Sequence, residues 1–279
     1  MLDASITPAA LKPDMVALLG LPLDKHSSFR SGAAAAPPRI RAALACESTN
    51  LSTENGLELG TEPRLADLGD LDLGVAGPAA LATITAAVAD VLVRRARVLA
   101  LGGDHSVTLP VLRAYGPRFP GLTVVQLDAH PDLYDNYGGN RLSHACTFAR
   151  VLEEGLVTRL VQVGVRTRNP HQRDQAERFG VGVLDMRDWP HGPFPAVSGP
   201  VYLSVDLDIL DPAFAPGVAH PEPGGCSTRE LLTLIQTLPG PLVGADIVEY
   251  LPAHDAGDAT ARVAAKLVKE LAARLLADD

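Results

Sequence analysis

Short apolar runs alternate with longer, helix-like segments along most of the 279-residue chain. The runs are rich in Val, Leu and Ala and lack regular polar alternation, a pattern typical of strands buried on both faces of a parallel sheet. The longer segments repeat apolar residues every three or four positions, as amphipathic helices do. We therefore expect strands at 15–20, 97–103, 122–127, 159–164, 181–184, 201–208 and 242–249, a short strand or loop at 65–72, and helices at 33–46, 78–95, 146–154, 228–238 and 258–276, with one more between 103 and 122.

Strands that alternate with helices predict βαβ crossovers around a mainly parallel central sheet. The expected fold class is therefore α/β, with three layers in the order α/β/α. A chain of 279 residues is within the range of a single core, and no internal repeat, low-complexity segment or linker interrupts the pattern. We expect one domain over residues 1–279.

Charge and cysteine content narrow the class of protein. The net charge is −9 and no basic cluster is present, which argues against a nucleic-acid partner. No apolar run reaches the roughly 18 residues of a membrane span. Cys46, Cys146 and Cys226 are too far apart for a CxxC pair, and they predict neither a disulfide framework nor a zinc knuckle. We expect a cytoplasmic protein that acts on a small cationic or neutral molecule.

Three candidate metal ligands follow the apolar run at 123–127. Asp128, His130 and Asp132 stand at positions i, i+2 and i+4. On extended backbone every second side chain points to the same face, so the three would converge just past the end of a strand. Parallel α/β sheets bind their ligands at this carboxyl edge. The pattern predicts a metal or catalytic site there.

Two other strand ends carry matching residues. His105 follows a strand in Gly102–Ser106, although a histidine after a Gly-Gly turn is by itself typical of an ordinary loop. Asp206 and Asp208 share a face at another strand end, where buried carboxylates need a cation or hydrogen bonds. Four carboxylates and two imidazoles suit two ions with bridging carboxylates, and oxygen-rich ligation favours manganese over zinc.

Two further residues complete a plausible site. His144, twelve residues after Asp132, has the chemistry to transfer protons near neutral pH, although alone it would be read as a surface-loop residue. Glu249 ends the last expected strand and could hold a planar guanidinium through two hydrogen bonds. Asp246 should point to the opposite face, and Asp211 precedes a proline, so both are expected to be structural.

Three motifs together resemble the ureohydrolase family, which contains arginases and agmatinases. They are Gly-Gly-Asp-His-Ser at 102–106, Asp-Ala-His-Pro-Asp at 128–132, and Ser-Val-Asp-Leu-Asp-Ile-Leu-Asp-Pro at 204–212. The similarity covers nearly the whole chain and is closest to plant-type arginases. It implies an arginase/deacetylase-like α/β/α fold, two Mn²⁺ ions per chain and a homo-oligomer, a trimer or a hexamer.

The resemblance also assigns roles by motif position. It implies that His105 and Asp132 bind one ion, that His130 and Asp208 bind the other, and that Asp128 and Asp206 bridge them. It implies catalytic roles for His144, Glu249 and Asp132, and substrate contacts for Glu249, His144 and Asn140. The activity implied is hydrolysis of the guanidinium group of L-arginine to ornithine and urea, by hydroxide formed at the metals. The alternative is agmatine, cleaved to putrescine and urea, or another guanidino compound.

The segments expected to hold the substrate tail depart from the animal-type arginase pattern. The loop at 133–141 is shorter, and the segment 164–169 has no clear match for the acidic residue that contacts the α-amino group. Arg141 or Arg166 could meet a carboxylate, whereas agmatine would need no cation. Two other classes stay open: an amide hydrolase of this fold with a single zinc ion, and a non-catalytic subunit. The intact candidate ligands argue against the second.

Overall fold

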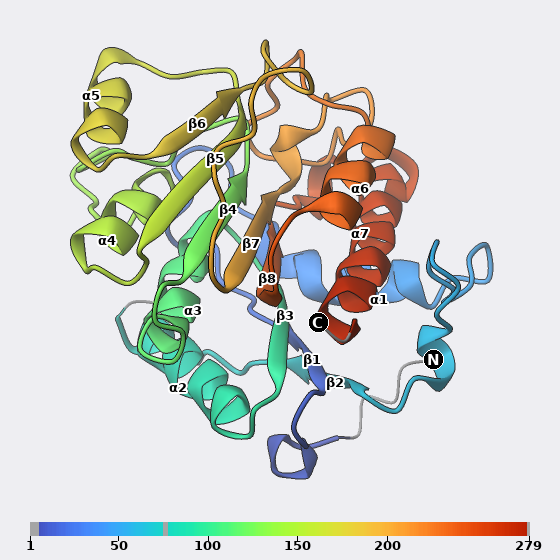
Figure 1. The fold of residues 1–279 in the computed structure, drawn as a ribbon. Coiled ribbons are helices and arrows are strands. Elements are labelled where there is room, and N and C mark those ends of the chain that lie inside the picture. Colours follow the sequence, from blue (N-terminus) through green and yellow to red (C-terminus); the bar gives the residue numbers. More distant parts are fainter. Residues whose placement is uncertain (1–5, 75–77, 278–279) are drawn as a thin grey trace.

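The computed structural model describes residues 6–74 and 78–277. Eight strands form one sheet in which all neighbouring strands are parallel, in the order β2-β1-β3-β8-β7-β4-β5-β6 (Figure 1). The strands are β1 (Val16–Gly20), β2 (Leu65–Asp70), β3 (Arg97–Leu101), β4 (Thr123–Leu127), β5 (Arg159–Val165), β6 (Gly182–Asp185), β7 (Val201–Asp206) and β8 (Leu242–Val248).

Helices cover both faces of the sheet, which gives the three predicted layers (Figure 1). One face packs against α1 (Ala36–Leu44), α6 (Thr228–Thr237) and α7 (Ala259–Leu276). The other packs against α2 (Pro78–Val93), α3 (Thr108–Tyr115), α4 (Thr147–Glu153) and α5 (Pro170–Arg178). The predicted three-layer α/β/α class with a parallel central sheet is confirmed.

Successive residues of the central strands point into different cores. In β7, Leu203 and Val205 belong to the cluster beneath α6 and α7, whereas Tyr202 belongs to the cluster on the opposite face. All three side chains are buried. A strand with apolar neighbours on both sides cannot show polar alternation, which explains the continuous apolar runs in the sequence.

Helix α5 is the element that periodicity did not predict. Its sequence, Pro-His-Gln-Arg-Asp-Gln-Ala-Glu-Arg, contains almost no apolar residue to form a stripe. The helix is instead marked by its beginning, where Asn169 caps it, Pro170 opens it and Gln172 closes a capping box. These cap residues were the signal available in the sequence.

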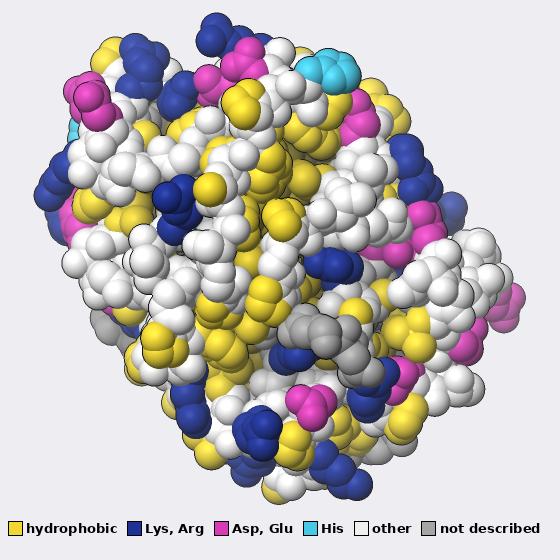
Figure 2. Space-filling view, viewed as in Figure 1, with side chains coloured by type: hydrophobic (Ala, Val, Ile, Leu, Met, Phe, Trp, Pro, Cys, Tyr) yellow, Lys and Arg dark blue, Asp and Glu magenta, His cyan; other side chains and the backbone are white. Residues whose placement is uncertain are grey.

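The surface carries mixed charge. On the face drawn in Figure 2, Lys and Arg side chains are interspersed with Asp, Glu and uncharged residues. None of the helices in the described residues is long and apolar enough to cross a membrane.

Candidate active site

The candidate residues gather at the carboxyl edge of four strands that are adjacent in the sheet. These strands are β3, β8, β7 and β4. His105 follows β3, Glu249 follows β8, Asp206 ends β7 with Asp208 just beyond it, and Asp128, His130 and Asp132 follow β4. Parallel strands end at one edge of a sheet, so residues distant in the sequence meet there.

Tight turns, rather than extended backbone, aim these carboxylates. The Oδ1 atom of Asp128 accepts the N–H of His130 at 2.6 Å, and Oδ1 of Asp206 accepts the N–H of Asp208 at 2.8 Å. Asp132 has a left-handed backbone, with φ of 51°. The expectation of alternate side chains on an extended strand was therefore wrong in detail, because side-chain to backbone bonds fold each segment into a turn.

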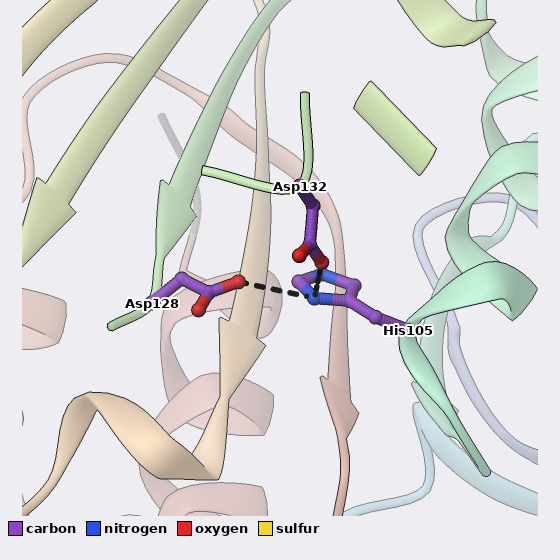
Figure 3. A group of neighbouring side chains, drawn as sticks. All are labelled: His105, Asp128 and Asp132. Carbon is purple, nitrogen blue, oxygen red and sulfur yellow. Dashed lines mark ion pairs between the residues drawn. The ribbon is translucent and has the colours of Figure 1, made fainter. Parts of the chain in front are cut away.

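The first cluster surrounds one nitrogen of His105. Its Nδ1 lies 3.2 Å from Asp128 Oδ2, 3.1 Å from Asp132 Oδ2 and 3.2 Å from Asp206 Oδ2. Figure 3 shows the Asp128 and Asp132 carboxylates directed at the ring. The Nδ1 atom is buried and has no hydrogen-bond partner. His105, Asp128 and Asp132 form a group that could hold a metal ion.

Hydrogen bonds on the far side of the ring select the tautomer of His105. Ser204 donates to Asp246 Oδ1 at 2.7 Å, so its oxygen is left to accept the proton of His105 Nε2 at 2.9 Å. Nδ1 then carries a lone pair, as a metal ligand requires. Asp246 also accepts the hydroxyls of Thr108 at 2.9 Å and Tyr202 at 2.8 Å. Its position fits the structural role expected for it.

The second cluster shares Asp128 with the first. His130 Nδ1 lies 2.9 Å from Asp208 Oδ2 and 3.6 Å from Asp128 Oδ1, and these three residues form a second group with metal-ligand spacing. The amide of Gln126 donates to Asp128 Oδ2 at 2.7 Å and so fixes the shared carboxylate. Two overlapping groups suit two cations better than the single zinc of the alternative class.

The charges of the cluster fit divalent cations. Burial and the Asp128 carboxylate raise the pKa of Asp132 to about 6. Burial, with the carboxylates of Asp208 and Asp128, raises the pKa of Asp206 well above its ordinary range. Buried acids that repel one another are stabilised by a cation among them. Together with the partnerless Nδ1 of His105, this donor set fits a pair of metal ions.

Glu249 and His144 form a pair beside the clusters. Oε1 of Glu249 accepts the N–H of His105 and binds Nδ1 of His144, both at 2.7 Å. Burial opposes protonation of His144, but the charge of Glu249 raises its pKa to about 9. The backbone N–H of Ser28 points at Nε2 from 3.1 Å. Because this N–H can only donate, it must turn away before Nε2 carries a proton, and the charge of Glu249 favours the protonated ring.

A cavity of about 210 Å³ opens onto these groups. It is lined by Ser28, His130, Asp132, Tyr134, Tyr137, His144, Ala145, Thr167, Gln172, Asp206, Asp208, His220 and Glu249. Among the described residues, neither Lys nor Arg lines it. The sequence reasoning assigned no role to Ser28, Tyr134, Tyr137, Thr167, Gln172 or His220, because none of them belongs to a set of acids and histidines at the end of a predicted strand.

Three residues considered for the substrate tail do not line this cavity. The side chain of Asn140 accepts the N–H of Leu142 at 2.9 Å, within its own loop. Arg141 pairs with Asp135 at 2.7 Å and with a glutamate of α4. Arg166 donates to backbone carbonyls, including that of Asp208 at 2.6 Å. Their polar groups are bonded elsewhere in this structure, so a role of these three residues as substrate contacts stays a prediction.

An all-parallel sheet with two overlapping His–Asp groups at the ends of its central strands defines an α/β/α protein with a candidate two-metal site. Sequence comparison narrows this class, because residues 14–273 match the model described as the Arginase family. The chain belongs to the arginase family.

Individual relatives agree with this assignment. Arginase 1, mitochondrial, of Arabidopsis thaliana is 45% identical over 306 aligned positions, which cover 99% of this chain and 89% of the relative. The solved arginase from Medicago truncatula has a TM-score of 0.87 at 42% identity, covering 94% of this chain and 87% of that chain. A solved hypothetical agmatinase from Burkholderia thailandensis is more distant, with a TM-score of 0.82 at 32% identity, covering 96% and 86%. The resemblance to plant-type arginases is confirmed.

The expectation of a cytoplasmic location is wrong by the same comparison. The Arabidopsis relative is named as a mitochondrial protein. The expectation rested on three cysteines that are free in the structure, which fit any reducing compartment. That property does not single out the cytosol, so the inference from cysteine content was too narrow.

Proposed function

We propose that this protein is an arginase that hydrolyses L-arginine to L-ornithine and urea. Water adds to the guanidinium carbon, the bond from that carbon to Nε breaks, and Nε leaves as the side-chain amine of ornithine. The observation that carries the proposal is the pairing of two metal-ligand groups with Glu249 in one cavity. The arginase relatives at 45% and 42% identity support arginine, since the agmatinase structure is more distant.

Two Mn²⁺ ions are proposed as the cofactor. His105 and Asp132 would hold one ion, His130 and Asp208 the other, and Asp128 and Asp206 would lie between them. The oxygen-rich donor set supports manganese over thiolate-seeking metals. Such a pair, when bound, supplies water of lowered pKa that is nucleophilic at neutral pH.

Glu249 is proposed to orient the guanidinium group. Its Oε1 is occupied by His105 and His144, whereas its Oε2 has no hydrogen-bond partner among the described residues. A carboxylate oxygen free to face the cavity can accept a guanidinium N–H. Glu249 itself has a left-handed backbone, with φ of 66°, and its two hydrogen bonds through Oε1 hold the carboxylate in place.

His144 is proposed to move the proton that the leaving nitrogen needs. Its raised pKa, about 9, makes proton uptake favourable at neutral pH. Uptake at Nε2 requires the Ser28 N–H to turn away, while the Ser28 hydroxyl, 2.8 Å from Nε2, can reorient to accept. Asp132, which faces His105 in the first cluster, would hold one ion, and we propose that it also assists His144, whose pKa its charge helps to raise.

Urea release tests the function directly. The Mn²⁺-reconstituted protein should release urea from L-arginine faster than from agmatine, 4-guanidinobutyrate or guanidine. No urea from any of these compounds would contradict the proposal. Agmatine is kept as the second candidate because no Lys or Arg of the described residues lines the cavity. The tail of agmatine is a cationic amine, which needs no cationic side chain to bind it.

We also propose that residues 1–279 form a single domain and that the chain assembles as a trimer or hexamer. The continuous eight-stranded sheet supports one domain, although residues 1–5, 75–77 and 278–279 lie outside the described part. The resemblance to ureohydrolases supports the oligomer. Light scattering coupled to size exclusion would measure the assembly, and a monomer at micromolar concentration would contradict it.

A further inference from the structure

Gln172 is a buried polar residue at the edge of the catalytic cavity. Its exposed fraction is 5%, yet it is one of the cavity-lining residues. It lies in the first turn of α5, beyond the end of β5. Glu249 follows β8, with β7 and β4 between β8 and β5 in the sheet. Gln172 and Glu249 therefore approach the cavity from opposite sides, as the two ends of an extended guanidino acid would require.

The capping box determines how the Gln172 amide points. The N–H of Gln172 donates to Asn169 Oδ1 at 2.9 Å, and the N–H of Asn169 faces Gln172 Oε1 at 3.4 Å. Because a backbone N–H can only donate, the amide oxygen must face the cap and Nε2 must face away from it. Nε2 has no hydrogen-bond partner among the residues that the structure describes. Nε2 is not one of the fully buried atoms that lack a partner, so it can donate a hydrogen bond to a ligand that enters the cavity.

Two hydroxyl groups near Gln172 have protons to donate as well. Tyr134 Oη accepts the Asn169 side-chain amide at 2.8 Å, which leaves its own O–H to donate elsewhere. The Thr167 hydroxyl makes no hydrogen bond with the rest of the described chain. Both residues line the cavity. The first turn of α5 and the loop after β4 are thus joined at Asn169 and together offer three neutral donors.

We propose that Gln172, assisted by Tyr134 and Thr167, receives the carboxylate of the substrate tail and is the residue that favours L-arginine over agmatine. This rests on the proposed arginase function and deepens it. No cationic side chain of the described residues lines the cavity, so a carboxylate must be bound there by neutral donors. The N-terminal end of α5 adds a favourable dipole for an anion.

Steady-state kinetics of Gln172→Leu with the Mn²⁺-loaded enzyme test the proposal. A hydrogen bond to a charged group is worth about 10- to 100-fold, so kcat/KM for L-arginine should fall by that factor, mainly through KM. Agmatine lacks the carboxylate, and its kcat/KM should change by less than about threefold. Gln172→Glu should lower the arginine-to-agmatine ratio further through repulsion. Glu is a preferred third residue of a capping box, so this variant keeps the helix cap.

Gln175→Leu is the matched control. Gln175 lies in the same helix and is buried to 6% exposure, but it does not line the cavity. This variant should keep the wild-type ratio of arginine to agmatine kcat/KM. Equal losses for both substrates in Gln172→Leu, or an unchanged ratio in both Gln172 variants, would overturn the proposal. A change in the arginine-to-agmatine ratio of kcat/KM that is as large in Gln175→Leu as in Gln172→Leu would also overturn the proposal. Such a result would show that the effect comes from a general change in α5.

Calorimetric titration separates failure of this inference from failure of the proposed function. If the wild-type protein released no urea, the arginase function would fail. Binding of L-arginine and agmatine to the wild-type and Gln172→Leu proteins would still be measured. A loss of affinity for L-arginine alone supports the carboxylate subsite, and equal affinities in the two proteins refute it.

Discussion

Replacing Gly103 by alanine should separate three segments that meet beneath the active site. A Cβ atom at this position would lie 1.8 Å from the carbonyl oxygen of Leu23 and 2.6 Å from its carbon. That oxygen accepts the N–H of Asp104 at 2.9 Å, and the oxygen of Gly103 accepts the N–H of Glu249 at 2.9 Å. Both obstacles are backbone atoms, so no side-chain rotation relieves the clash.

The size of the effect follows from this geometry. Cβ contacts under 3.0 Å essentially never occur, so the two backbones must part by at least about 1.2 Å. Overpacking against backbone costs about 3 kcal/mol or more. For a chain of this size, that loss of unfolding free energy lowers Tm by roughly 6–12 °C. Displacement of the segment that carries His105 should also weaken metal binding.

Differential scanning calorimetry and metal analysis measure both effects. Gly60→Ala is the control, because the nearest atom to a Cβ there is the flexible Oε1 of Glu58 at 3.1 Å. The control should stay within about 0.5 kcal/mol of wild type. A Gly103→Ala protein with wild-type Tm, metal content and urea release would refute the reasoning.

Three more outcomes are expected. Asp128→Asn should reduce bound metal below one ion per chain without changing the far-ultraviolet circular dichroism, because both clusters use this carboxylate; retention of two ions would contradict the shared role. Asp246→Ala should weaken metal affinity about 10- to 100-fold in chelator competition, since Ser204 loses its acceptor and His105 its fixed tautomer; unaltered affinity would exclude this support. Burial raises the pKa of the Cys226 thiol to about 12 from an ordinary 9.0. The unfolded chain therefore releases the thiol proton at a lower pH than the folded chain does. The free energy of unfolding should fall as the pH rises from 9 towards 12, by at most about 1.4 kcal/mol per pH unit. Cys226→Ala should flatten the alkaline decline of Tm, and an identical decline would count against the assignment.

The sequence was most informative where burial and periodicity coincide. Apolar runs located seven of the eight strands, because a strand covered on both faces needs apolar residues throughout, whereas β2 at the edge of the sheet was left open between strand and loop. The strand ends then indicated which acids and histidines would meet. Periodicity could not reveal α5, whose face towards the protein is narrow and whose residues are mostly polar. A helix stabilised by its N-terminal cap needs no apolar stripe, and Asn169 and Pro170 were the signals in the sequence for its start.

The substrate side of the cavity was harder to predict for a physical reason. Asp128 and Asp206 are recognisable because unpaired acids are rare at buried strand ends. Gln172 and Thr167 are ordinary surface residue types. Their proposed importance comes from side-chain donors that have no hydrogen-bond partner in the described residues, which only the structure reveals. Arg141 suggested itself as an anion ligand by charge, but Asp135 and Glu153 already neutralise it.

The residues proposed for catalysis and those proposed for substrate selection follow different strands of the sheet. The metal-ligand groups and Glu249 come from four adjacent central strands, whereas Ser28 follows β1 and Gln172 follows β5, the strands that flank those four. Gln172 makes no hydrogen bond to either metal-ligand group, so substitutions there should change substrate selection more than the hydrolytic centre, whereas Ser28 contacts His144 and affects both. The segment after β5 is therefore where we expect a change of guanidino substrate to be possible with the metal-ligand groups left intact.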